Sequence, residues 1–451
     1  MEAIIPRIRK EKVPQTLGRK LKIAKKPISK GFLSVLGPGL ITGASDDDPS
    51  GIGTYTQAGA EFGFGLLWTL LFTLPLMVAI QEVSARVGRI SGVGIVANIK
   101  SRYSGWVLYP VVFLLLTANT INIGADIGAM GDALKLVIGG PAIAYSVGLA
   151  AICVLLQIFL KYEQYARHLK WLTVVLFSYV AIAFTVHVPW GQALRGLTVP
   201  VFTASGEYWA TFIAVLGTTI SPYLFFWQAS QETEEIKSHP KQKSLDEDPG
   251  QALGQFKRIR LDTYAGMTFS NVVAFFIILA AAVTLHAKGI TKVDTCAQAA
   301  EALRPIAGRL TFMLFSLGIV GAGMLAVPVL AGSAAYAVGE AMDWPIGLSC
   351  KLRKAKGFYA VLIGSTFMGL VMDIPWVQQR FHISPIGALF WSAVINGLAA
   401  VPIMAIIMRM SETRKGGGEL VRLPTGLRIM GWVTTAVMAA AAVGMFVNWS
   451  K

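Results

Sequence analysis

The chain has 451 residues, of which 54% are hydrophobic and only 14% are charged, and its mean hydropathy is +0.58. These values exclude a soluble globular domain of this size and are typical of a protein that lies mostly within a membrane. The formal net charge of +15 would also suit a nucleic-acid-binding protein, but the basic residues are spread over the loops of one membrane face. We therefore expect no nucleic-acid partner.

Eleven apolar runs each supply the roughly 20 residues that a helix needs to cross a hydrocarbon core about 30 Å thick. Their approximate ranges are 33–58, 65–88, 105–130, 141–160, 170–188, 206–229, 264–286, 309–338, 356–374, 384–408 and 428–448. The sequence therefore predicts an all-α membrane protein with about eleven transmembrane helices.

The distribution of basic residues predicts the orientation, because Lys and Arg concentrate in the cytoplasmic loops of membrane proteins. With the N-terminus inside, 32 of the 40 Lys and Arg residues fall on the cytoplasmic side. We expect a multi-pass protein of the inner (plasma) membrane with its C-terminus outside. Residues 1–31 are expected to form a basic cytoplasmic tail.

Two of the expected helices carry a proline beside polar residues near their centres. Residues 46–49 read Asp-Asp-Asp-Pro, and residues 217–223 read Gly-Thr-Thr-Ile-Ser-Pro-Tyr. Proline removes a backbone donor and clashes with the preceding turn, so we expect breaks near 47–51 and 218–222. For either segment alone an ordinary proline kink is an equally good interpretation. A true break is tolerated in a membrane only where the freed backbone lines a cavity or binds something.

The positions of the two breaks suggest an internal repeat, because they fall in the first and sixth helices. A block of five helices crosses the membrane an odd number of times, so the second block starts from the opposite side of the membrane. The two blocks are therefore expected to be inverted repeats. The expected repeats are 32–188 and 206–408, followed by an eleventh helix and the C-terminus at 428–451. Paired interruptions at matching positions indicate the substrate site of a secondary transporter near the membrane midplane.

Three consecutive aspartates in mid-membrane need compensation, because each costs roughly 2.5–3.5 kcal/mol on insertion scales. Water, unwound backbone and a bound cation can supply it. Asp48, directly before Pro49, is best placed to share a cation with carbonyl groups of the second break. Asp46 and Asp47 are expected to line an aqueous vestibule.

At these positions the sequence resembles the Nramp family of divalent metal transporters. Those proteins carry Asp-Pro-Gly-Asn and then Gln-Ala-Gly-Ala in helix one, and Met-Pro-His in helix six. Here residues 48–51 read Asp-Pro-Ser-Gly, residues 57–60 read Gln-Ala-Gly-Ala and residues 221–223 read Ser-Pro-Tyr. The resemblance covers nearly the whole chain and implies a LeuT-like 5+5 inverted repeat with discontinuous helices 1 and 6. It also implies transport of divalent metal cations by alternating access.

The departures from the family motif bear on the choice of metal. Gly51 stands where the family has a metal-binding asparagine, Ser221 where it has methionine and Tyr223 where it has histidine. A thioether favours softer metals, whereas oxygen ligands suit Mg²⁺, Ca²⁺ and Mn²⁺, and smaller side chains leave room for a hydrated ion. The pattern resembles the Nramp-related magnesium transporters. We expect Mg²⁺ and/or Mn²⁺ as the transported substrate and no separate cofactor.

The resemblance implies two sets of site residues. The expected metal ligands are Asp48, Ser221, Gly51, Thr218 and Asn396, the last because the family places a polar helix-ten residue near the metal. The residues expected to act in a vestibule or in coupling are Asp46, Asp47, Asp126 and Tyr223. For Asp126 the alternative is a hydrogen-bonded residue of the core.

Two other functions stay open at this stage. A transporter of small organic solutes or amino acids with the same fold would pair a substrate amine with Asp48. An intramembrane aspartyl protease would need two carboxylates that share a proton, such as Asp48 and Asp126. Asp48 lies at a helix break, which is a poor position for a general base. We therefore expect a transporter and no enzyme. The protein is expected to lie in the lipid bilayer, with a monomer as the working assumption and the oligomeric state open.

Two charged segments have simpler interpretations. Glu82 is expected to reach the cytoplasmic interface beside Arg86 and Arg89. Residues 232–235, which contain three glutamates, are expected to form a solvated charged turn after the sixth helix.

Overall fold

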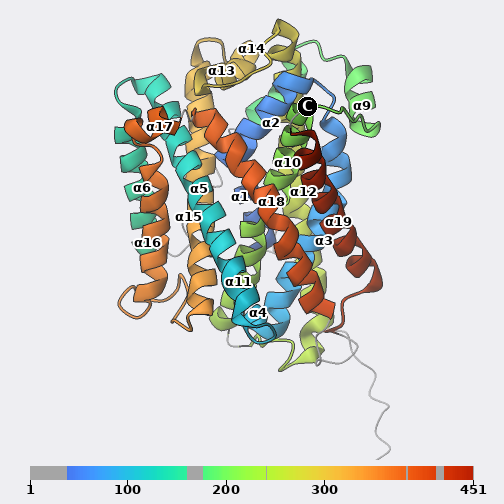
Figure 1. Cartoon of the computed structure of the whole chain (residues 1–451), viewed down its shortest axis with the longest axis vertical. Helices are drawn as coiled ribbons and strands as arrows, with labels where there is room; N and C mark the ends of the chain where they lie inside the picture. Colours follow the sequence, from blue (N-terminus) through green and yellow to red (C-terminus); the bar gives the residue numbers. More distant parts are fainter. Residues whose placement is uncertain (1–37, 160–175, 240, 382–383, 413–420, 450–451) are drawn as a thin grey trace, which may run out of the picture. The chain divides into compact units, whose positions relative to one another are not determined.

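The computed structural model describes residues 38–159, 176–239, 241–381, 384–412 and 421–449, and these residues form helices and connecting segments without a strand (Figure 1). The continuous long helices are α3 (Leu67–Ser91), α5 (Gly105–Ile138), α6 (Ala142–Phe159), α12 (Ala252–Thr284), α15 (Thr311–Ala341), α16 (Lys356–Val371), α18 (Pro385–Glu412) and α19 (Thr425–Asn448). Shorter helices are α4 (Ile95–Lys100), α8 (Phe177–Thr185), α9 (Trp190–Thr198), α13 (Cys296–Ala300), α14 (Arg304–Ala307) and α17 (Pro375–Phe381).

Two further pairs of helices are interrupted spans. α1 (Pro38–Asp46) and α2 (Pro49–Phe62) are separated at residues 47–48, and α10 (Gly206–Thr219) and α11 (Pro222–Ser238) are separated at residues 220–221. In each pair the second helix begins with the proline, whose missing N–H costs nothing at a first helical position. The discontinuities expected in helices 1 and 6 are therefore confirmed.

Eight helical segments of the described chain are long and apolar enough to cross a membrane. The other three expected spans are the broken α1–α2 pair, the 16-residue α16 and the 170–188 segment, of which α8 is the described helix. The α1–α2 pair is split by its break into helices of 9 and 14 residues, α16 is shorter than the roughly 20 residues of a full span, and the start of the 170–188 run lies outside the described residues. The broken α10–α11 span is among the eight. The basic tail at 1–31 lies outside the described residues.

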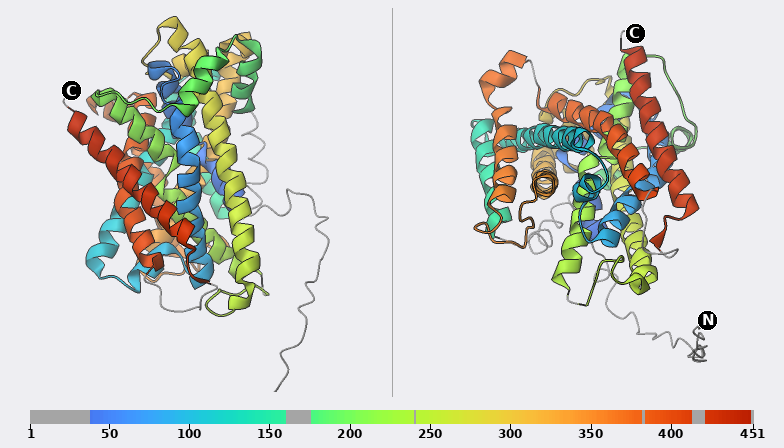
Figure 2. Two further views of the ribbon diagram at one scale, coloured as in Figure 1. Left: turned by 90° about the vertical axis from the view of Figure 1, so that its right-hand side faces the viewer. Right: turned by 60° about the horizontal axis from the view of Figure 1, so that its bottom comes forward.

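α5 and α12 organise the packing around the breaks. α5 packs against α15, α18, α6 and α16, whereas α12 packs against α1, α2 and α3. α10 packs against α18, and α11 against α3 and α15, so the two broken spans lie between the α5 and α12 groups. α19, dark red in both views of Figure 2, lies at the periphery against α18, α3 and α10.

The connections gather at two ends of the helical body. α4 and the end of α11 lie at one end, and α9, α13, α14 and α17 lie at the other (Figure 1). We call the first the basic end, because most of the described loops rich in Lys and Arg lie there. Which end faces the cytoplasm stays a prediction from the charge distribution.

The expected solvated turn at residues 232–235 is wrong. α11 continues to Ser238, and the Glu232 side chain is fully buried. Glu232 Oε2 forms an ion pair with Arg258 of α12 and lies 4.0 Å from Nη1 of Arg89 on α3. Because two arginines from neighbouring helices neutralise it, the carboxylate is held inside the basic end rather than in water.

Glu82 also pairs with a basic residue near this end. Its Oε1 accepts hydrogen bonds from Nε and Nη2 of Arg86 at 3.0 and 2.7 Å. Both residues are on α3, one helical turn apart, and both are buried. The pairing explains how a glutamate is accommodated so deep in an apolar helix.

Candidate metal site

Asp48 occupies the gap in the first broken span, where it caps the N-terminus of α2. Its backbone is extended, with φ −74° and ψ 170°, and its side chain accepts a hydrogen bond from the N–H of Gly51. Aspartate at the cap and proline at the next position are among the best residues for starting a helix. The local sequence Asp-Pro-Ser-Gly therefore starts α2 and fixes the position of the carboxylate.

Four donors surround the Asp48 carboxylate. Oδ1 accepts from the N–H of Gly51 at 2.7 Å and from Oγ of Ser50 at 2.8 Å. Oδ2 accepts from Nδ2 of Asn122 at 3.1 Å and from the hydroxyl of Tyr223 at 3.3 Å. Since Asp48 is only 1% exposed, these bonds replace the water that a buried anion would otherwise need.

Tyr223 joins the two breaks. Its hydroxyl, in the first turn of α11, lies 3.3 Å from Oδ2 of Asp48 and 3.3 Å from the carbonyl oxygen of Ser45. One proton serves only one of these acceptors at a time. The side chain expected in a vestibule or in coupling therefore contacts the carboxylate expected to bind the metal.

The second break carries Ser221 at the N-cap of α11. The Ser221 hydroxyl donates to the carbonyl oxygen of Gly217 at 2.5 Å and lies 3.1 Å from that of Thr218. Because its proton is directed toward α10, the oxygen lone pairs are the part of Ser221 that can face a cation.

The space expected beside Gly51 is occupied in this conformation. A Cβ atom on Gly51 would lie 3.3 Å from Oγ1 of Thr218, 3.4 Å from the carbonyl oxygen of Asp46 and 3.4 Å from the Tyr55 ring. These contacts bring the start of α2 against the end of α10. The absence of the asparagine side chain thus allows close packing here rather than a wide cavity.

Asp46 and Asp47 are less well compensated than Asp48. Oγ of Ser270 on α12 lies 2.6 Å from Oδ2 of Asp46 and 3.0 Å from Oδ1 of Asp47. The other oxygens, Oδ1 of Asp46 and Oδ2 of Asp47, are buried without a hydrogen-bond partner among the described residues. Both residues are at most 1% exposed, so neither lines a water-filled vestibule in this conformation.

Asp126 and Asn396 lie near the breaks with polar atoms available. Asp126, on α5, faces the backbone of Ser50 and the charge of Asp48, and no described group donates to its carboxylate with normal geometry. Asn396, on α18, is 1% exposed and both of its side-chain polar atoms lack a described partner. Among the described residues no hydrogen bond joins Asn396 to Asp48, and the roles of Asp126 and Asn396 stay predictions.

The sequence analysis missed three residues that complete the site. Asn122 donates to Asp48 and accepts a hydrogen bond of 2.7 Å from Oγ of Ser392 on α18, and Ser270 contacts the other two aspartates. Asn122 and Asp126 are four residues apart on α5 and so lie on one helix face. That spacing was the available signal for Asn122, whereas nothing in the local sequence indicates Ser270 or Ser392.

The donor set limits how a cation can be held. In the part of the chain that the structure describes, no three His, Cys, Asp or Glu side chains are arranged to hold a metal ion. A cation at the breaks would therefore rely on one or two carboxylates together with hydroxyl, amide and carbonyl oxygens. Such oxygen ligands suit Mg²⁺, Ca²⁺ and Mn²⁺.

Comparison with known sequences identifies the family. The family model for natural resistance-associated macrophage protein-like (Nramp) sequences matches residues 39–448. The chain belongs to the Nramp family. The divalent metal cation transporter MntH of Klebsiella pneumoniae (strain 342) is 25% identical over 422 residues, covering 90% of this chain and 92% of that protein. MntH of Yersinia pestis (strain Pestoides F) is 26% identical over 324 residues, covering 68% and 73%.

Solved structures show the same fold. The crystal structure of the Eremococcus coleocola manganese transporter has a TM-score of 0.70 at 16% identity, covering 92% of this Nramp chain and 87% of that chain. Mhp1, a nucleobase-cation-symport-1 family transporter in a closed conformation, has a TM-score of 0.57 at 15% identity, covering 92% and 90%. The expected LeuT-like fold is confirmed.

The fold similarity includes a transporter crystallised with an organic ligand, so the fold alone does not distinguish a metal from an organic substrate. Family membership carries more weight, because Nramp proteins are transporters, and it removes the protease alternative. The expectation of a transporter rather than an enzyme is confirmed. The magnesium branch and the individual site residues stay predictions.

Proposed function

We propose that this Nramp chain moves divalent metal cations across the membrane by alternating access, and that Mg²⁺ and Mn²⁺ compete for one site between the two helix breaks. The names of the related proteins, divalent metal cation transporter and manganese transporter, support the first part of the proposal. The donor set at the breaks supports the second.

The observation that carries the proposal is the surroundings of Asp48. The carboxylate lies between α2, α5 and α11, and its described contacts are backbone, hydroxyl and amide groups. Ser221 and Tyr223 stand where the family motif has methionine and histidine, so these two positions offer hydroxyl oxygens in place of a thioether and an imidazole. Oxygen ligands lower the preference for softer metals and favour Mg²⁺ and Mn²⁺.

Asp48 supplies the anionic ligand in this proposal, with Ser221, Thr218, Asn396 and the backbone at Gly51 as the surrounding oxygen ligands. Their burial, at most 2% exposure for the four side chains, supports a mechanism in which the ion reaches the site only when the helices move. Asp126 and Tyr223 adjoin Asp48 and are proposed to act in coupling.

Uptake by the purified protein in proteoliposomes tests the proposal. Mn²⁺ uptake should be inhibited by an excess of Mg²⁺, and Mg²⁺ uptake should itself be measurable, with and without a pH gradient. If a large excess of Mg²⁺ does not inhibit Mn²⁺ uptake, the proposal that Mg²⁺ and Mn²⁺ compete for one site is wrong. If neither metal is carried, the metal-transport proposal is wrong as a whole.

A further inference from the structure

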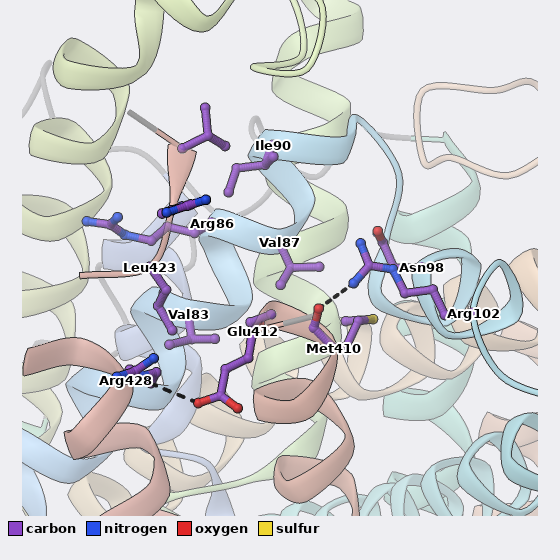
Figure 3. A pocket seen from close by; sticks show the side chains of 13 residues that line it. Val83, Arg86, Val87, Ile90, Asn98, Arg102, Met410, Glu412, Leu423 and Arg428 are labelled. Atoms are coloured by element: carbon purple, nitrogen blue, oxygen red, sulfur yellow. Dashed lines mark hydrogen bonds and ion pairs between the residues drawn. The ribbon is translucent and has the colours of Figure 1, made fainter. Parts of the chain in front are cut away.

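A cavity lies at the basic end, and Figure 3 shows the side chains that line it. Its volume is about 310 Å³, and it lies between the end of α3, the segment before α5, the end of α18 and the start of α19. One water molecule needs only about 10–15 Å³ by this measure. The cavity is therefore large enough for a polar group of several atoms.

Arginines dominate the charge of this cavity. Among the described residues, four arginines line it, Arg86, Arg102, Arg422 and Arg428, against one carboxylate, Glu412. The Arg86 guanidinium is neutralised by Glu82 and lies 4.1 Å from the Phe256 ring centroid. The other three arginines are exposed. Arginine forks bind phosphate oxygens through paired hydrogen bonds, so a phosphate fits this lining better than a carboxylate or a metal.

The N-terminus of α19 further favours the binding of an anion in this cavity. Arg422 and Arg428 flank the N-terminus of this 24-residue helix, where no side chain caps the first turn. Cations are unfavourable at a helix N-terminus, because the helix dipole is positive there. Glu412 relieves the repulsion only in part, since its Oε1 lies 3.8 Å from Nε of Arg428 and also accepts a hydrogen bond of 2.8 Å from Nε1 of Trp432.

The surface next to the cavity indicates an amphiphilic ligand. Ile429 and Val433 follow on α19, are 55% and 41% exposed, and lie on one helix face because they are four residues apart. Trp432 lies between them in sequence, and tryptophan is enriched where a membrane helix meets the headgroup layer. A polar head in the cavity would thus be continuous with an apolar surface along α19.

We propose that this cavity binds the phosphate of an anionic phospholipid, with Arg422 and Arg428 as its main contacts and an acyl chain along Ile429 and Val433 of α19. Basic pockets between transmembrane helices are a recognised way of binding such headgroups. The site is separate from the proposed metal site, and its test does not depend on which ion is transported.

Thermal unfolding of the full chain in detergent micelles tests the proposal. Phosphatidylglycerol should raise the unfolding temperature in a saturable way, and phosphatidylcholine should not. The double variant Arg422→Ala with Arg428→Ala should need at least about tenfold more phosphatidylglycerol for the same shift, because both of the proposed arginine contacts to the phosphate are lost. The variant Lys351→Ala with Arg353→Ala is the matched control, since it removes two exposed charges from a loop that does not line the cavity.

The outcomes separate the possible ligands. Equal stabilisation by phosphatidylcholine, or an unchanged response of the Arg422 and Arg428 variant, would overturn the proposal. Inorganic phosphate at matched concentration should give no comparable shift, and an equal shift would indicate a site for free phosphate rather than lipid. Should the double variant fail to fold, Arg422→Ala alone, at an exposed side chain, should weaken the response in the same direction.

Discussion

Asp48 has two roles that a single substitution can confuse. It caps α2 through Gly51, and it is the proposed anionic ligand of the metal. Replacing an N-cap aspartate by alanine costs about 1 kcal/mol of stability, whereas asparagine caps a helix about as well as aspartate does. A neutral side chain of the same shape therefore separates the structural role from the role of the charge.

Asp48→Asn is expected to abolish metal transport while keeping the cap on α2, because Oδ1 still accepts from Gly51. The amide nitrogen that replaces Oδ2 cannot accept the hydrogen bond of Asn122, which is expected to cost about 1–3 kcal/mol of stability. Asp48→Ala is expected to lose transport and also to be less stable. Flux in proteoliposomes and thermal unfolding of the purified variants measure the two effects. Near wild-type flux in Asp48→Asn would remove Asp48 from the metal site.

Ser221 offers a test of metal selectivity at the other break. Ser221→Met restores the thioether of the family motif, so Mn²⁺ and Cd²⁺ should compete better against Mg²⁺ than in the wild type. The shift is expected to be partial, because Gly51 still lacks the family's amide side chain. The ratio of half-inhibitory Mg²⁺ concentrations for Mn²⁺ uptake measures it. An unchanged ratio in a folded variant would exclude this position as a determinant of selectivity.

At the scale of helices, the breaks were predictable and their partners were not. Pro49 and Pro222 act through local rules, so both interruptions fall where the sequence places them. Ser270 and Ser392 come from helices more than 170 residues away from Asp48 along the chain, and a serine in an apolar helix carries no local signal of its partner. The depth of Glu232 was missed for the same reason, since Arg89 and Arg258 reach it from other helices.

The first broken span depends on glycine to approach α12. A Cβ atom on Gly43 of α1 would lie 2.3 Å from the backbone carbonyl of Gly266, and one on Gly39 would lie 2.8 Å from the backbone nitrogen of Thr263. The N–H of Gly39 also donates to Oδ2 of Asp262 at 2.6 Å. α1 thus rests directly on the backbone of α12, and this contact sets the position of the aspartates at its end.

Gly43→Ala is expected to destabilise the protein by about 1–3 kcal/mol and to lower transport, because backbone atoms must move to admit the methyl group. Gly148→Ala on α6 is the matched control, since no atom lies within 4 Å of the position its Cβ would take. It should be neutral or slightly stabilising, as alanine is the better helix former. Equal effects of the two substitutions on unfolding temperature would show that α1 does not depend on this contact.

At the scale of the whole molecule, the structure is closed around the proposed site, so transport requires the helices on at least one side to separate. Glu232 links the basic ends of three helices, α3, α11 and α12, through Arg89 and Arg258. Arg89 also donates a hydrogen bond of 2.7 Å from Nη2 to Oε1 of Gln242. Removing one partner of such a buried group leaves charges uncompensated, so this cluster is expected to hold the basic end closed.

Two buried threonines can report on the closure of each end. Thr42 lies on α1 and Thr54 on α2, on opposite sides of the first break, and both are 0% exposed. A cysteine at either position, in a background without the three native cysteines, reacts with a membrane-impermeant thiol reagent only when its side of the site opens. The ratio of the two reaction rates therefore reports the balance between the two open states.

Glu232→Gln is expected to shift this balance toward the state open at the basic end, because the amide cannot neutralise the two arginines. Thr42→Cys should then react about tenfold faster for each 1.4 kcal/mol of shift, and Thr54→Cys should react more slowly.

The matched control is Glu301→Gln, whose 2.9 Å pair with Arg304 is partly exposed at the opposite end. If Glu232→Gln does not fold, Glu235→Gln weakens the same cluster at a 3.2 Å contact with Arg258. Equal acceleration of both cysteines would indicate general loosening and contradict a gate at the basic end.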